Sequence, residues 1–178
     1  METKIFDTAL GLFGIGWTDA GVARVQLPGL DRDALAARIN RDGAVPGVPN
    51  RRVEAVIERI EDYAAGERVA FSAADVDLAG VPEFHRRAYQ ALLAFGWGQT
   101  TSYGELAQAL GDRTLARAVG QAMGANPVPL LVPCHRVLAS TGKPGGFSAP
   151  GGAGSKVRML ALEGVSVGAP AGQMAFGF

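Results

Sequence analysis

The sequence changes character at Gly80-Val81-Pro82, and this change limits the folds open to the 178-residue chain. Before this point, runs of β-branched and aromatic residues alternate with helix-like segments. After it, most segments show the apolar spacing of short helices. We therefore expect two domains, an α/β unit over residues 1–80 and a mostly helical unit over residues 81–178.

The first half contains a hairpin signal and two helix signals. Two β-type runs flank Asp19-Ala20-Gly21, as expected for antiparallel strands joined by a tight turn. A short helix is predicted from about Leu35 to Asn40, after an aspartate that caps its start, and a longer one from Arg51 to Ala64. Residues 68–78 then favour a strand.

The second half favours a helix after Pro82 and then two short helices joined by a turn. Ser102 and Glu105 form a capping-box pattern at the start of the first short helix. Gly111-Asp112-Arg113 is the predicted turn, and residues 114–126 form the second short helix. This arrangement is typical of a helix-turn-helix.

The second of these helices has an unusual polar face, made of Arg117, Gly120, Gln121 and Gly124. A glycine in a helix interior costs up to about 1 kcal/mol, so two on one face require a reason. Either the helix backbone approaches a rigid surface such as a nucleic-acid groove, or it packs closely against another helix. The spacing alone favours neither.

Composition restricts the chemistry more than the fold. The net charge is zero, but residues 1–80 carry a net −4 and residues 81–178 a net +4, so the second half is the better candidate for meeting an anion. A single cysteine excludes an internal disulfide and a thiolate-rich zinc site. The N-terminus lacks a secretory signal and no run reaches membrane-spanning length, so we expect a cytoplasmic protein that keeps its thiol reduced.

That cysteine, Cys134, lies beside His135 in the segment LLVPCHRVL. An apolar strand is predicted before it, and adjacency alone does not form a catalytic pair, because neighbours in an extended segment point to opposite sides. Glu163 is placed within a predicted last helix that starts at Ser155, where it could orient the imidazole. Thiol, imidazole and carboxylate would form an activated nucleophile, while a buried, inert cysteine is the alternative.

Taken in order, several motifs resemble the O6-alkylguanine-DNA alkyltransferases, or methylated-DNA–protein-cysteine methyltransferases. The motifs are SYGELA at 102–107, ARAVGQAM at 116–123, NPVPLLVPCHRV at 126–137, GGFS at 145–148 and LEG at 162–164. The resemblance implies a ribonuclease-H-like α/β N-terminal domain and a winged-helix-like C-terminal domain with a helix-turn-helix. It also implies a monomer that repairs double-stranded DNA bearing O6-alkylguanine, with O4-alkylthymine as a further candidate substrate.

The resemblance also assigns roles to single residues. Cys134 would accept the alkyl group, His135 would take its proton through a bridging water, Glu163 would orient His135, and Asn126 would brace the turn. Tyr103 would donate a hydrogen bond to N3 of the guanine. The DNA-binding residues would be Arg117, Gly120, Gln121 and Gly124, with Arg117 filling the gap left by a flipped base. The substrate pocket would be lined by Pro129, Val137, Phe147, Ser148 and Lys156.

Three departures from the family pattern stand out. Phe147 occupies a position where many members have tyrosine, so a ring is present but no hydroxyl. The stretch from Ala149 to Ser155 is about two residues longer than in some relatives. There is no added cysteine-rich module, and neither a metal site nor a cofactor is expected.

Three functions are therefore compared. The first is a single-turnover alkyltransferase that transfers the alkyl group irreversibly to Cys134. The second is a lesion-binding alkyltransferase-like module that transfers nothing, against which the presence of Cys134 argues. The third is a thiol hydrolase, which would need an oxyanion hole that the sequence does not show.

Overall fold

A four-stranded sheet forms the first part of the computed structural model, in which residues 1–167 are described. Strands β1 (Glu2–Thr8), β2 (Gly11–Thr18) and β3 (Gly21–Gln26) are antiparallel, and β4 (Val45–Pro46) pairs parallel to β1. The strand order is β3-β2-β1-β4. The predicted hairpin is confirmed, whereas β1 was not predicted, because its charged residues interrupt the apolar pattern.

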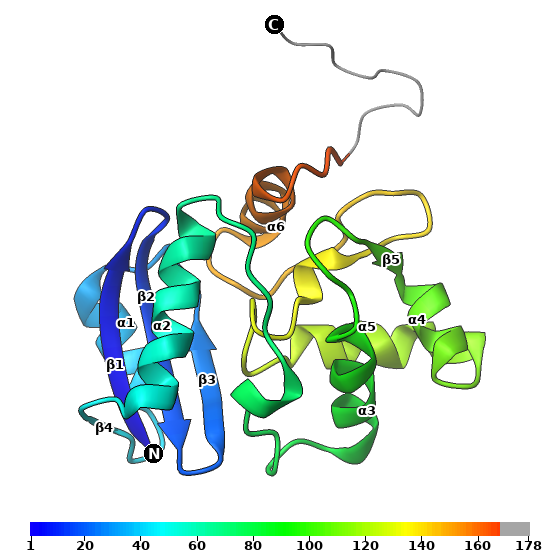
Figure 1. The fold of residues 1–178 in the computed structure, drawn as a ribbon. Helices are drawn as coiled ribbons and strands as arrows, with labels where there is room; N and C mark the ends of the chain where they lie inside the picture. The colour runs from blue at the N-terminus through cyan, green and yellow to red at the C-terminus, as the bar shows by residue number, and fades with distance from the viewer. Residues whose placement is uncertain (168–178) are drawn as a thin grey trace, which may run out of the picture.

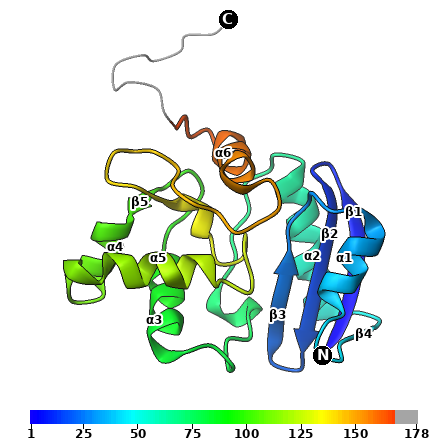
Figure 2. The same ribbon diagram turned by 180° about the vertical axis from the view of Figure 1, so that it is seen from behind.

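Two helices cover opposite faces of this sheet, α1 (Arg32–Ile39) on one and α2 (Arg51–Ala64) on the other (Figures 1 and 2). The side chain of Asp31 caps α1 by accepting a 2.8 Å hydrogen bond from the backbone N–H of Ala34. This helix therefore begins earlier than the predicted Leu35. The bounds of α2 agree with the prediction, and its apolar stripe is buried against the sheet.

The strand predicted over residues 68–78 is wrong. Only Val76 forms a β-bridge in this described segment, with Val22, and Ala73–Asp75 is a 3-10 turn. The side chain of Asp75 instead accepts hydrogen bonds from Arg59 at 2.6 and 3.1 Å and from the backbone N–H of Ser72 at 2.7 Å. Local side-chain bonds of this kind compete with a strand ladder for the backbone groups.

The second half begins with α3 (Glu83–Leu92) and continues with the two predicted short helices. A two-residue strand, β5 (Thr101–Ser102), leads into α4 (Tyr103–Ala109), and the predicted capping box is present at its start. A 3-10 turn (Arg113–Leu115) joins α4 to α5 (Ala116–Gly124). Both predicted helices and the turn between them are thus confirmed.

The apolar strand predicted before Cys134 is also wrong. Leu130 has φ of +79°, and the one β-pairing within this fully described segment is a bridge between Pro129 and Val132. The segment forms a turn instead, closed by a 3.0 Å hydrogen bond from the N–H of Val132 to the carbonyl of Val128. A strand is disfavoured here because Pro127 and Pro129 have no N–H to donate to a β-ladder. The short strand β6 (Val137–Leu138) comes after the cysteine and pairs parallel to β5.

The last described helix, α6 (Gly152–Leu162), lies at the top of the molecule between the two halves (Figure 1). It begins three residues before the predicted Ser155, and Glu163 caps its C-terminus instead of lying within it. One cluster of buried apolar side chains includes residues of the sheet, α2, α3, α5 and α6. Residues 168–178 of the predicted C-terminal domain lie outside the described part. Within that part, none of the helices is long and apolar enough to span a membrane.

Candidate active site

Cys134 opens a single 3-10 turn, Cys134–Arg136, that follows Pro133. The turn is closed by a 2.9 Å bond from the N–H of Arg136 to the carbonyl of Pro133. Successive side chains of a 3-10 turn are about 120° apart, so Cys134 and His135 do not point to opposite sides as they would in a strand. The cysteine is 3% exposed and its histidine neighbour is fully buried.

His135 is fixed by one of its two ring nitrogens. Its Nε2 lies 2.7 Å from Oε1 of Glu163, while Nδ1 is buried and has no hydrogen-bond partner among the described residues. Burial lowers the pKa of His135 despite the opposing effect of Glu163, so the ring is neutral at neutral pH. Because a carboxylate accepts at Nε2, the proton is on Nε2 and Nδ1 keeps a free lone pair.

The carboxylate of Glu163 collects hydrogen bonds from four residues. Besides His135, Arg136 donates from Nε at 2.8 Å and from Nη2 at 3.0 Å, the hydroxyl of Tyr63 donates at 3.1 Å, and the N–H of Gly98 donates at 3.0 Å. Burial would raise the pKa of Glu163, but the bonds from His135 and Arg136 outweigh it and lower the pKa to about 2. Glu163 is therefore a buried, fully paired anion.

Cys134 itself is held mainly as a thiol. Burial raises its pKa, and this effect is opposed by the amide of Asn126 and the positive charge of Lys156. Asn126 also closes the turn that precedes the cysteine, since its Nδ2 donates to the carbonyl of Val132 at 2.9 Å and its Oδ1 accepts from the N–H of Val128 at 3.0 Å. A nearby base is needed before this thiol can act as a nucleophile.

Lys156 is fully buried, which is rare for a lysine. Its ammonium donates to the carbonyl of Val137 at 2.6 Å and to the hydroxyl of Tyr103 at 3.5 Å. The same nitrogen lies 5.6 Å from the ring centre of Tyr103 and 6.0 Å from that of Phe147. Burial lowers the pKa of Lys156 to about 8, so a positive charge is present near Cys134 at neutral pH.

Two of the five predicted pocket residues, Phe147 and Ser148, line one cavity of about 400 Å³. Its walls are formed by Tyr103, Gly120, Met123, Gly124, Cys134, Gly146, Phe147 and Ser148. Pro129 lines an adjoining cleft, whereas Val137 and Lys156 line neither cavity, and the Lys156 ammonium donates to the Val137 carbonyl. The cavity therefore has a sulfur nucleophile, aromatic rings and a glycine-containing loop in its wall.

The glycine face of α5 is open. Arg117 and Gln121 are exposed, and a side chain at Gly124 would meet no atom within 4 Å. A side chain at Gly120 would only touch the Tyr103 ring, at 4.0 Å. Close packing against another helix is therefore not the reason for Gly124, while Gly120 lies next to Tyr103 at the start of α4.

Sequence reasoning missed two contributors to this site. Tyr63 belongs to the apolar stripe of α2 and lies 100 residues before Glu163, so no local pattern marks it. Gly98 contributes only its N–H. Arg136 has a structural part in this site, since it forms an ion pair with Glu163 and donates to the carbonyl of Phe95. Among residues 1–167, no group of three His, Cys, Asp or Glu side chains is placed to hold a metal ion.

Comparison with known proteins places this geometry in one family. Residues 83–165 match the family model described as the 6-O-methylguanine DNA methyltransferase, DNA binding domain. The chain is 43% identical over 113 residues to the methylated-DNA–protein-cysteine methyltransferase of Mycolicibacterium paratuberculosis, covering 64% of this chain and 66% of that protein. It is 39% identical over 120 residues to the Sulfolobus acidocaldarius protein of the same name, covering 67% and 73%.

A solved structure extends the likeness to almost the whole chain. The structure of Mycobacterium tuberculosis OGT in complex with DNA superimposes with a TM-score of 0.76, at 29% identity, and covers 92% of each chain. The chain matches a little less than two thirds of the length of the mycobacterial relatives in sequence. It belongs to the methylated-DNA–protein-cysteine methyltransferase family, and it has that family's fold of a mixed sheet with helices.

Replacing Tyr63 by phenylalanine tests the network around Glu163. The change removes one donor from a buried carboxylate while keeping the ring, so we expect the free energy of unfolding to fall by about 1.5–3 kcal/mol at about pH 7. Glu163 has a pKa of about 2 in the folded chain against an ordinary 4.5, so its contribution to stability is present above about 4.5 and is lost as the pH falls toward 2. Tyr63→Phe raises the folded pKa, and the difference between variant and wild type should shrink below about pH 4.5.

Urea unfolding followed by circular dichroism at a series of pH values measures this difference. Tyr89→Phe is the matched control, since the Tyr89 hydroxyl is also buried and donates to the carbonyl of Ala122 at 2.6 Å, away from Glu163. The control should lose stability without a change in its acid dependence. If both variants show the same pH profile, Tyr63 does not act through Glu163.

Proposed function

We propose that this chain repairs DNA by transferring an alkyl group from O6 of guanine to the sulfur of Cys134, once per molecule. The observation that carries the proposal is the buried Nδ1 of His135, which has no hydrogen-bond partner within residues 1–167 and lies one residue from a cysteine in the wall of a base-sized cavity. A basic nitrogen in that position can take up the thiol proton through a bridging water. Family membership supports the same activity.

The chemical step is an in-line displacement. The Cys134 proton passes to Nδ1 of His135, the thiolate attacks the alkyl carbon, a C–S bond forms and the C–O6 bond breaks with its electron pair leaving on the guanine. Glu163 stabilises the imidazolium that results, as an ionised carboxylate does in other triads. Tyr103 donates its hydroxyl proton in a hydrogen bond to N3 of the leaving guanine. The thioether product has no route back to a thiolate, so each chain reacts once.

The target base has to leave the double helix, because a thiol in a closed pocket cannot reach O6 within stacked base pairs. We assign α5 to the minor groove, where its open glycine face lets the backbone approach and Arg117 fills the vacated stack. Gln121 and Gly124 would contact the same groove. The DNA complex of the M. tuberculosis relative supports a DNA partner.

The finer architecture belongs to the proposal as well. We assign residues 1–80 to a ribonuclease-H-like domain and residues 81–178 to a winged-helix-like domain whose helix-turn-helix is α4 and α5. The protein would act as a cytoplasmic monomer, in a compartment that keeps Cys134 reduced. Limited proteolysis tests the domain boundary. If the boundary is correct, the protease should cleave first near the exposed Gly80.

A duplex carrying one radiolabelled O6-methylguanine tests the transfer. Counting the label on the protein should give saturation near one methyl group per chain, and Cys134→Ala should take up none while still binding the duplex. Binding without label in the wild type would contradict transfer and would favour the lesion-binding module. Label uptake by Cys134→Ala would show that another residue is the acceptor.

Arg117→Ala tests the assigned role of α5. The variant should slow repair of O6-methylguanine in duplex DNA by roughly tenfold or more, since filling the vacated stack offsets an unstacking cost of a few kcal/mol. Reaction with free O6-benzylguanine should slow much less, because no base has to be flipped. Stopped-time assays of labelled protein measure both rates. If the variant slows both reactions equally, Arg117 does not fill the vacated stack.

A further inference from the structure

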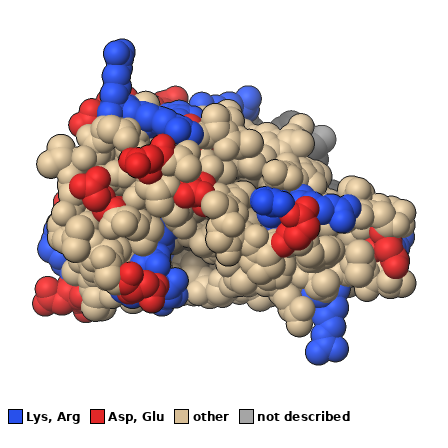
Figure 3. Space-filling view, turned by 90° about the horizontal axis from the view of Figure 1, so that it is seen from below, with Lys and Arg blue, Asp and Glu red and all other residues tan. Residues whose placement is uncertain are grey.

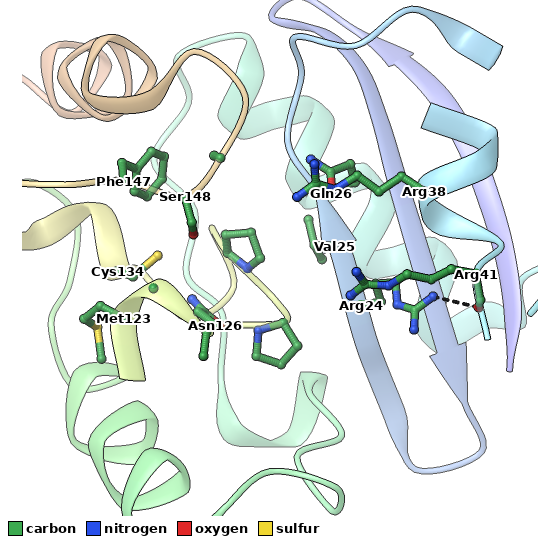
Figure 4. A pocket seen from close by; sticks show the side chains of 15 residues that line it. Arg24, Val25, Gln26, Arg38, Arg41, Met123, Asn126, Cys134, Phe147 and Ser148 are labelled. Atoms are coloured by element: carbon green, nitrogen blue, oxygen red, sulfur yellow. Dashed lines mark hydrogen bonds between the residues drawn. The ribbon is translucent and has the colours of Figure 1, made fainter. Parts of the chain in front are cut away.

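A second cleft, of about 260 Å³, lies between the two halves of the molecule and adjoins the base pocket (Figure 4). Its C-terminal wall includes Met123, Gly124, Cys134, Phe147 and Ser148, which also line the base pocket. Its opposite wall comes from the N-terminal half. The two cavities are therefore continuous, and a group that occupied the cleft would lie beside a base in the pocket.

Three arginines, Arg24, Arg38 and Arg41, dominate the N-terminal wall. Asp42 is the one acid within ion-pair distance of them in the described chain, at 2.8 Å from Arg24 and 3.5 Å from Arg41. Arg38 is exposed and forms no ion pair or side-chain hydrogen bond with another described residue. The wall therefore has an excess positive charge, although residues 1–80 carry a net negative charge.

Figure 4 shows the side chains of Arg38 and Arg41 extending from the N-terminal half toward the wall that holds Cys134 and Ser148. In the view from below, acidic and basic side chains are interspersed over the surface, with a hollow between the two halves (Figure 3). Within this mixed surface, the three arginines stand together on one wall of the cleft, which adjoins the cavity that holds Cys134.

The position of this wall is fixed by hydrogen bonds. The N–H of Val25 in β3 donates to the carbonyl of Pro127 at 2.8 Å, which ties the sheet to the turn after α5. Arg24 donates to the carbonyls of Ile39 at 2.9 Å and Arg41 at 3.1 Å, and so holds the end of α1 against the sheet. Arg24 is a structural residue in this arrangement. Among the described residues Arg38 has no such contact, and the head group of Arg41 has only a 3.5 Å ion pair with the exposed Asp42, so both can turn to a ligand.

We propose that Arg38 and Arg41 bind a backbone phosphodiester of the DNA strand whose flipped base enters the pocket. This inference rests on the proposed function, which places a nucleotide at the mouth of the pocket. Flipping a base turns its sugar and flanking phosphates toward the protein, and guanidinium groups match phosphate oxygens in charge and geometry. The N-terminal half would then supply part of the DNA-binding surface, in addition to α5.

Duplex binding as a function of salt tests the proposal. The double variant Arg38→Ala/Arg41→Ala should bind the O6-methylguanine duplex roughly tenfold more weakly at low salt. Its log K should also fall less steeply with log salt, by about 0.9 for each phosphate that the variant no longer neutralises. Neither side chain holds the fold together, so the variant should remain folded. The matched control is Arg51→Ala/Arg68→Ala, which removes two exposed arginines of the same half that do not line the cleft.

Neutral phosphate analogues separate a direct contact from a general effect of charge. A set of duplexes carries one methylphosphonate each, at a different position flanking the lesion. At one of these positions the methylphosphonate should weaken binding by the wild type but should not further weaken binding by the double variant. Full additivity at every position, or equal salt slopes for the double variant and its control, would overturn the proposal. Transfer by the wild type from free O6-benzylguanine tests the proposed function separately, because that reaction requires no DNA backbone.

Discussion

The buried carboxylate of Glu163 is the interaction on which the rest of the site depends. It joins the end of α6 to the turn that carries Cys134, through His135 and Arg136, and to α2 through Tyr63. A buried charge is costly unless it is paired, and five donated hydrogen bonds pair this one. The carboxylate also sets the tautomer of His135. The same group therefore stabilises the fold and leaves Nδ1 of the imidazole able to accept a proton.

This arrangement explains why a raised thiol pKa is compatible with nucleophilic chemistry. Burial protects the Cys134 thiol from reaction in the absence of substrate, because little thiolate is present. In the proposed reaction, the neutral His135 and the nearby charge of Lys156 would provide for proton removal once an alkylated base lies in the pocket. A cysteine that reacts only once, as we propose for Cys134, would benefit from this protection, since any other reaction would consume it.

Local sequence patterns predicted the helices well and the segments between them poorly. The apolar period of residues 51–64 and the Ser102–Glu105 capping box are decided by neighbouring residues, and the structure agrees with both. Residues 68–78 and 130–132 also have strand-like composition, but Asp75 and the prolines at 127 and 129 direct their backbones into turns. At the site, the motif indicated Cys134, His135 and Glu163. The contact from Tyr63 and the arginines of the cleft depend on how distant segments pack, and net charge gave no sign of them.

The central claim is that Glu163 leaves His135 neutral with a free Nδ1, and nuclear magnetic resonance of the ¹⁵N-labelled imidazole tests it most directly. At about pH 7 the Nε2 resonance should be of the protonated, pyrrole type and the Nδ1 resonance of the unprotonated, pyridine type. Glu163→Gln should alter this pattern, because an amide no longer fixes the Nε2 proton. A ring protonated on Nδ1, or on both nitrogens, in the wild-type protein would contradict the account.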